Sequence, residues 1–289
     1  MSAILRDEHL RAQILVARDR LRVLEYLAVH PRENLHLIDL VSEVSPRRRP
    51  QEMPPQVVVA WRGDRIEGVA ALRPSMVLDW GMTEAGLEAC LPILTSASTG
   101  LIKSPKEGVR RLWAQLQLRG REAMIDRGET AWLLESSRGG CPEWADSPSV
   151  RLRPAGEGDL EELVHAARGS LREEGRPDPF RGDPTGFRRW VRGRLPQARL
   201  VEVDGRPVFV GYADVRRSEG WLIQGVYCWP DYRRNGYARA GMAGMVREAF
   251  AAGADHVQLA VVEGNEAAVG LYSSLGFQPF CELRTILFA

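Results

Sequence analysis

Apolar positions in the second half of the chain recur with two different spacings, and these predict both strands and helices. Residues 150–154 alternate between apolar and polar side chains, which is typical of a half-buried strand. Apolar side chains then recur every three or four positions, at Leu160, Leu163, Val164 and Ala167, which is typical of an amphipathic helix. We therefore expect this half to open with a strand and a helix.

A hairpin signal and several periodic segments extend this series. Asp204-Gly205 lies between two apolar runs, and both turn residues of a type I′ hairpin must adopt a positive φ. The remaining periodic segments predict a helix at 187–195, strands at 221–229, 256–262 and 280–288, and helices at 238–252 and 266–275. The resulting order, β-α-α-β-β-β-α-β-α-β, predicts an α/β domain around a mixed sheet.

The first half of the chain repeats part of this pattern. Gly63-Asp64 again lies between two apolar runs, and residues 68–73 match residues 211–216 at Gly, Ala and Arg. One short match leaves open whether the chain contains a duplication or two unrelated hairpins.

A segment rich in Gly, Pro and Ser separates the two halves. Residues 136–149 sustain neither a helical nor a strand period, which is typical of a boundary. We predict one domain at residues 1–140, a linker at 141–149 and a second domain at 150–289.

Composition places the chain among ordinary globular proteins and excludes several classes. Of 289 residues, 44% are hydrophobic and 27% charged, and a formal net charge of +1 provides no field to attract nucleic acid. Four separated cysteines and five dispersed histidines suggest neither a metal site nor a disulfide framework. The chain lacks an apolar run of the roughly 18 residues that a membrane helix needs, and its start lacks a secretory pattern. We expect a cytoplasmic protein without a nucleic-acid or membrane partner.

The segment from Val226 to Arg239 carries the strongest chemical signal. A strand ending at Pro230 leads into a basic turn with one glycine, Gly236, and then into an Ala-rich helix. Amides at a helix start point outward and the helix dipole favours negative charge, so this segment can bind a diphosphate. The other interpretation is a plain strand-turn-helix connection with solvated arginines.

Two motifs in the second half resemble those of the GNAT superfamily of N-acetyltransferases. Pro230-x-x-Arg233-x-x-Gly236-x-Ala238 is similar to its coenzyme A signature, and residues 265–277 resemble its later Asn-x-x-Ala, Leu-Tyr and Leu-Gly-Phe stretch. The first half lacks the signature and looks like a degenerate lobe, with a basic turn at residues 101–108. The resemblance therefore implies two GNAT-like α/β lobes in tandem, each with a mixed, mainly antiparallel sheet flanked by helices.

The resemblance also implies roles for individual residues. Tyr272 matches the tyrosine that protonates the departing thiolate in many relatives, with Tyr227 as a fallback, although Tyr272 could also simply pack beside Leu275. Asn265 matches a pantetheine contact and could equally cap the following helix. The positions implied to bind acetyl-CoA are Val226, Cys228, Arg233, Arg234, Asn235, Gly236, Tyr237, Ala238, Arg239 and Asn265.

The proton acceptor cannot be identified from the sequence. The strand at 221–229 contains no acidic residue, and Asp214 and Glu219, the nearest, are interpreted as surface charges at a strand end. Cys228 lies among apolar residues, where a thiol usually behaves as a small hydrophobe.

The resemblance implies an acetyl-CoA-dependent N-acetyltransferase whose acceptor is a primary amine of a small molecule or peptide. The sequence leaves open two alternatives: an aminoacyl-tRNA-dependent transferase and a non-catalytic acyl-CoA-binding regulator. Either a monomer or a homodimer is compatible with the chain.

Overall fold

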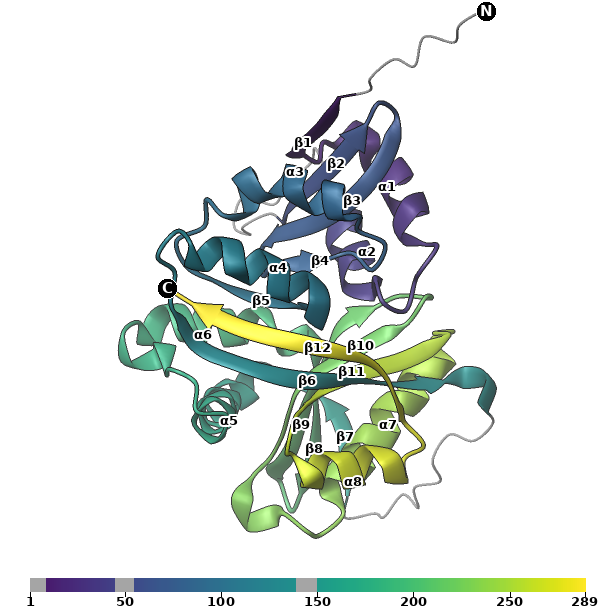
Figure 1. Ribbon diagram of the computed structural model, residues 1–289. Helices are drawn as coiled ribbons and strands as arrows, with labels where there is room; N and C mark the ends of the chain where they lie inside the picture. The colour runs from purple at the N-terminus through teal and green to yellow at the C-terminus, as the bar shows by residue number, and fades with distance from the viewer. Residues whose placement is uncertain (1–8, 45–54, 139–149) are drawn as a thin grey trace, which may run out of the picture. The chain divides into compact units, whose positions relative to one another are not determined.

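The computed structural model describes residues 9–44, 55–138 and 150–289, and these residues form two compact units (Figure 1). Unit 1 comprises Met1–Glu129 and Cys281–Ala289, and unit 2 comprises Thr130–Phe280. The predicted linker at 141–149 lies outside the described residues. The division falls within two strands and gives the last nine residues to unit 1, whereas the predicted boundaries assign them to the second domain. The predicted domain boundaries stay a prediction, because compact units in space need not coincide with lobes that arose by duplication of the sequence.

The same order of elements occurs twice along the chain. The first series contains β1 (Leu10–Ile14), α1 (Arg20–Leu27), α2 (Leu35–Ser42), β2 (Gln56–Arg62), β3 (Arg65–Arg73), β4 (Val77–Leu78), α3 (Glu84–Leu94), β5 (Gly100–Pro105), α4 (Lys106–Gln117) and β6 (Ala123–Glu135). The second contains β7 (Arg151–Pro154), α5 (Leu160–Glu173), α6 (Pro184–Gly193), β8 (Ala198–Val203), β9 (Arg206–Arg216), β10 (Trp221–Cys228), α7 (Tyr237–Ala251), β11 (His256–Val262), α8 (Glu266–Ser274) and β12 (Gln278–Phe288). The order predicted for the second half is confirmed, and its recurrence favours duplication over coincident hairpins.

The strands of unit 1 form two groups. Strands β1 to β4 pair in chain order as an antiparallel sheet, and β5 pairs antiparallel with β12 from Gly100↔Phe288 to Pro105↔Leu283. A parallel bridge between Met76 and Ile102 connects the first group to β5. Alternate residues of β2 face opposite cores: Val57 and Val59 pack with α1 and α2, while Val58 packs with α3 and α4.

In unit 2 the strands follow the order β7-β8-β9-β10-β11-β6. Phe209 and Ala213 on one face of β9 pack against α7, whereas Val210 and Tyr212 on the other face pack against α5 and α6. Because successive strand residues point to opposite faces, the near-continuous apolar run of β9 supplies both cores. In the described part of the chain, no helix is long and apolar enough to span a bilayer.

Candidate functional site

Strands β10 and β11 pair over only two positions. Their parallel ladder contains Trp221↔Val257 and Leu222↔Gln258, although β10 continues to Cys228 and β11 to Val262. The other edge of β10 stays paired with β9 as far as Cys228↔Phe209. Beyond Leu222, the facing edges of β10 and β11 therefore make no strand-to-strand backbone pairing with each other. Their backbone groups there can bond an extended ligand. Both strand positions implied to bind pantetheine, Val226 and Cys228, lie in this part of β10.

A bulge interrupts β10 where the two strands part. The register with β9 shifts between Gln224 and Tyr227. Gly225 lies in this bulge with φ of +58°, a conformation that side-chain-bearing residues rarely adopt, and it is exposed. The bulge therefore presents bare backbone to solvent beside the open strand edge.

The turn between β10 and α7 presents a row of backbone amides. Arg234 and Gly236 both adopt positive φ, of 65° and 82°, and Gly236 precedes the first turn of α7 without a capping side chain. The first backbone bond of the helix runs from the Ala240 amide to the Gly236 carbonyl at 3.0 Å. Among the described residues, no acceptor contacts the amides of Tyr237, Ala238 and Arg239. These donors and the helix dipole are together suited to bind an anion.

The two arginines of the turn have different surroundings. Arg233 donates from Nε to the Cys228 carbonyl oxygen at 2.9 Å and from Nη2 to the Glu173 carboxylate at 2.6 Å, and its guanidinium lies 5.5 Å from the centre of the Tyr227 ring. This side chain fixes the turn to β10 and α5. Arg234 is exposed and has no side-chain partner within the described ranges, so it is the arginine available for a phosphoryl group.

The remaining polar residues of the turn also have local partners. The Asn235 side-chain amide donates to the carbonyl oxygens of Tyr232 and Arg233 at 3.3 and 3.1 Å. Arg239 reaches the Ser274 carbonyl oxygen at 3.5 Å. Asn265 caps α8, because its Oδ1 accepts from the Ala268 amide at 3.1 Å. The capping role considered for Asn265 is confirmed, and its pantetheine contact stays a prediction.

Tyr272 is buried yet keeps a hydroxyl without a protein partner. It lies in α8 with 6% of its surface exposed and packs edge-on against Phe277, with ring centres 5.8 Å apart. No hydrogen bond to its hydroxyl occurs within the described ranges. Burial raises the pKa of this phenol well above its ordinary value, so it stays protonated at neutral pH. The arrangement combines the packing role with a hydroxyl that can donate.

Tyr227 is less suited to donating a proton. It belongs to the core between the sheet and α5, whereas Tyr272 belongs to the core beneath α7. A Cβ added at Gly169 of α5 would lie 2.5 Å from the Tyr227 hydroxyl, so this hydroxyl closely approaches the helix backbone. Cys228 is half-buried, and burial raises the pKa of its thiol, which agrees with the inert role expected from the sequence.

The interpretation of Asp214 as a surface charge is wrong. Its carboxylate accepts from Nη2 and Nε of Arg194 at 2.6 and 3.3 Å, and only 24% of the side chain is exposed. Burial raises the pKa of Asp214, against the effect of Arg194. Arg194 was not singled out in the sequence, because one arginine in an arginine-rich chain carries no motif. Glu219 pairs with Arg217 at 3.1 Å.

In unit 1, side chains bond the backbone at the two positions that correspond to the candidate site of unit 2. By element order, the turn between β4 and α3 corresponds to the turn before α7. There, the Thr83 hydroxyl accepts from the Gly86 amide at 2.9 Å and so caps the helix. The Ser104 hydroxyl accepts from the Leu78 amide at 2.7 Å and donates to its carbonyl oxygen at 3.2 Å, which bridges β4 to β5. The basic turn at 101–108 instead corresponds to the connection between β11 and α8.

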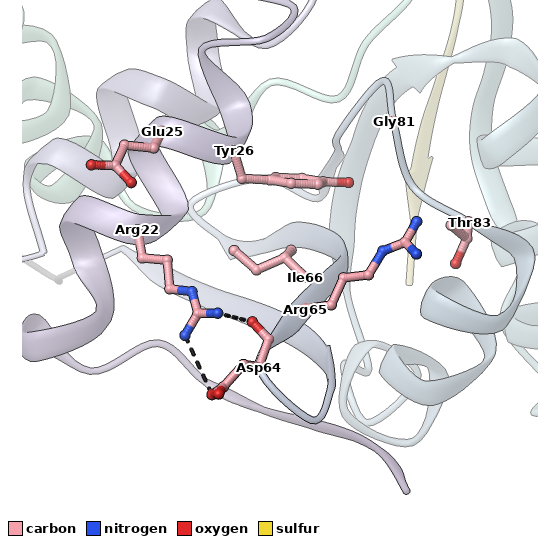
Figure 2. Close-up of a pocket in the computed structure, with 8 residues that line it drawn as sticks. All are labelled: Arg22, Glu25, Tyr26, Asp64, Arg65, Ile66, Gly81 and Thr83. Carbon is pink, nitrogen blue, oxygen red and sulfur yellow. Dashed lines mark hydrogen bonds and ion pairs between the residues drawn. The ribbon is translucent and has the colours of Figure 1, made fainter. Parts of the chain in front are cut away.

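Each unit also contains a cavity. In unit 1 a cavity of about 400 Å³ is lined by Arg22, Glu25, Tyr26, Asp64, Arg65, Ile66, Gly81 and Thr83 (Figure 2). Figure 2 shows Arg22 of α1 bonded to Asp64 of the β2–β3 hairpin, with the Tyr26 ring above them in this view. A cavity of about 220 Å³ in unit 2 adjoins the end of β11 and is lined by Thr130, Trp132, Val261, Val262, Glu263, Gly264 and Val269. The second cavity lies beside the turn that contains Asn265.

A protein-family model matches most of the second series of elements. Residues 160–277 match the model of the acetyltransferase (GNAT) family. No curated protein matches the sequence.

Solved structures match nearly the whole chain. A Drosophila protein is 15% identical, with a TM-score of 0.74 over 96% of this chain and 98% of that chain. A tandem GNAT protein from the clavulanic acid biosynthesis pathway is 14% identical, with a TM-score of 0.56 over 97% and 98%. A GCN5-related N-acetyltransferase from Sphaerobacter thermophilus is 17% identical, with a TM-score of 0.56 over 96% and 94%. These structures confirm the fold expected from the resemblance, two such α/β lobes in tandem.

Proposed function

Because residues 160–277 belong to the acetyltransferase (GNAT) family, we propose that unit 2 transfers an acetyl group from acetyl-CoA to a primary amine by direct attack. Family membership supports acyl transfer in general. The choice of acetyl-CoA and of an amine acceptor is our own proposal, and it depends on the fit of the site to each.

The unpaired amides of residues 237–239 are the observation on which the proposal depends. They lie at the start of α7, behind two positive-φ residues and beside the exposed Arg234. A row of outward amides and one exposed guanidinium supply the donors and the positive charge that a pyrophosphate needs. The unpaired edge of β10 then offers backbone donors and acceptors to the pantetheine amides.

Tyr272 fits the role of proton donor. When bound, acetyl-CoA would supply a thioester whose carbonyl carbon an amine attacks, so that the carbon–sulfur bond breaks. The leaving sulfur needs a proton, and the Tyr272 hydroxyl stays protonated and has no protein partner. Since β10 itself contains no carboxylate, the proton lost by the amine is proposed to pass to solvent, from which Tyr272 regains the proton that it gave to the sulfur.

We further propose a cytoplasmic enzyme, monomeric or homodimeric, whose acceptor is a small molecule or a peptide. The near-neutral charge provides no field for a transfer RNA, which disfavours the aminoacyl-tRNA alternative.

Two measurements on the full chain test the proposal. Isothermal titration with acetyl-CoA, coenzyme A and 3′-dephospho-coenzyme A should show binding of all three, since the proposed contacts involve the pyrophosphate and pantetheine. A thiol-release assay over an amine library should show turnover above hydrolysis. Absence of acetyl-CoA binding would overturn the coenzyme site. Binding without turnover over the whole library would favour the acyl-CoA-binding regulator.

A further inference from the structure

The guanidinium of Arg194 is held rigidly at the end of α6. Its central carbon lies 4.0 Å from the ring centre of Tyr212 and 5.2 Å from that of Trp190. Asp214 takes the edge formed by Nε and Nη2, with bonds of 3.3 and 2.6 Å. Aromatic contacts fix the plane of the guanidinium and the carboxylate fixes its rotation within that plane.

The opposite end of this guanidinium has no protein partner. Nη1 makes no hydrogen bond within the described residues, whereas Nε and one N–H of Nη2 are used by Asp214. With 22% of the Arg194 side chain exposed, the group still reaches solvent. A guanidinium with five N–H donors therefore presents its Nη1–Nη2 edge, the edge that binds a carboxylate through two parallel hydrogen bonds.

Arg194 lies directly beside the bulge of β10. A Cβ added at Gly225 would lie 3.6 Å from Arg194 Nη2 and 3.0 Å from the Tyr212 ring. Gly225 is exposed and precedes Val226, a position proposed to bind pantetheine. A small ligand bound to the free edge of Arg194 would therefore lie beside the stretch of β10 that receives the thioester arm.

The charges around this position favour a negatively charged group. Asp214 interacts with two arginines, Arg194 and Arg216, so the cluster keeps a net positive charge. Arg216 bonds the carbonyl oxygens of Pro196 and Gln197 and lies over Trp221, which keeps it in place. The exposed half of Trp190 adds an apolar wall.

We propose that the free edge of Arg194 binds a carboxylate of the acceptor, so that the acceptor is a small amine that also carries a carboxylate, of the amino-acid class. This inference rests on the proposed function and specifies its substrate. The carboxylate is held by Arg194, and the amine extends toward the β10 bulge. Asp214 is a positioning residue, which orients the guanidinium without contacting the acceptor.

The test compares acceptors that differ only in the carboxylate. The twenty common amino acids and their methyl esters are assayed with acetyl-CoA by thiol release. We expect at least one amino acid to exceed its ester by tenfold or more in kcat/KM. Arg194→Met should abolish this preference by raising KM for the amino acid at least tenfold, with a much smaller effect on the ester. Asp214→Asn should raise the same KM with little effect on kcat.

Arg192→Met is the matched control. Arg192 is also in α6, and its side chain pairs with the exposed Glu157 at 3.0 Å rather than with Arg194 or Asp214, so its replacement should leave the preference intact. Equal use of acid and ester by the wild type, or an equal loss on both in Arg194→Met, would overturn the inference. If neither set is acetylated but simple amines are, the inference fails and the proposed function stands. If acetyl-CoA does not bind at all, both fail.

Discussion

Arg233 Nε donates a hydrogen bond to the carbonyl oxygen of Cys228 at 2.9 Å, and the same guanidinium pairs with Glu173. The side chain therefore ties the end of β10 to the turn that presents the amides. The acetyl-CoA contact that the resemblance implies for Arg233 stays a prediction, and these bonds add a role in shaping the turn.

Replacement of Arg233 by Met should weaken acetyl-CoA binding about tenfold, since a charge-assisted hydrogen bond contributes about 1.5–3 kcal/mol. Glu173→Gln removes only the ion pair, which is half exposed, and keeps the bond to Cys228. Its effect should stay below about threefold, because exposed pairs contribute about 0–1 kcal/mol. Titration calorimetry measures both. Equal losses in the two variants would show that the ion pair, not the carbonyl bond, holds the turn.

Gly236→Ala should reduce both stability and coenzyme affinity. The residue adopts φ of +82°, which costs a non-glycine residue about 1–2 kcal/mol. Gly253, just after α7, has φ of +83° and open space around it, so Gly253→Ala carries the same conformational cost far from the amides. Urea unfolding should show similar losses, and only Gly236→Ala should weaken acetyl-CoA binding. A matching loss of affinity in Gly253→Ala would make the effect one of stability alone.

Tyr272→Phe separates catalysis from binding. The hydroxyl has no partner in the described protein, so its removal should change the free energy of unfolding by less than about 0.5 kcal/mol. Loss of a general acid should lower kcat about 10²-fold or more while the Kd for acetyl-CoA stays unchanged. A thiol-release assay measures kcat, and titration calorimetry on the same preparation measures the Kd for acetyl-CoA. An unchanged kcat would leave Tyr272 as a packing residue only.

Two titratable groups of unit 1 give opposite pH dependences. Burial raises the pKa of Asp79 to about 6, so its contribution to stability is present at acid pH and is lost as the pH rises from about 4 to 6. Burial and the charge of Lys103 lower the pKa of His36 to about 4, so its contribution is lost as the pH falls over the same range. Each is on the order of 3 kcal/mol, and in the wild type they largely cancel.

The single variants should expose these two slopes. Relative to wild type, His36→Gln should lose stability as the pH rises from 4 to 6, whereas Asp79→Asn should gain it. Urea unfolding of the full chain at several pH values measures both. Curves that stay parallel to the wild-type curve would contradict the assigned pKa values.

The second half of the fold was predictable because its elements follow local periodicity. The strand at 256–262 and the hairpin at Asp204-Gly205 need only spacing and turn chemistry. The motif at 226–239 likewise locates the turn and the helix start. Sheet neighbours distant in sequence leave no such local signal, so the pairing of β5 with β12 was not anticipated.

The contacts that define the site's chemistry were less predictable. The pairing of Arg194 with Asp214 joins the end of a helix to a residue near the end of a strand, and neither residue belongs to a chemical motif. The bridging of Leu78 by Ser104 also depends on a contact between residues distant in sequence, whereas the cap of α3 by Thr83 is a local contact. The sequence therefore indicated that the first lobe is degenerate. It did not show that Thr83 and Ser104 occupy the positions that correspond to the candidate site of unit 2.

The pairing of β5 with the last strand also bears on synthesis of the chain. Gly100 leaves the ribosome long before Phe288, its partner, is translated. Until then β5 has an uncovered edge, which is a template for unwanted association. We therefore expect a chaperone to protect this edge during translation. We also expect chains truncated before β12 to aggregate through unit 1.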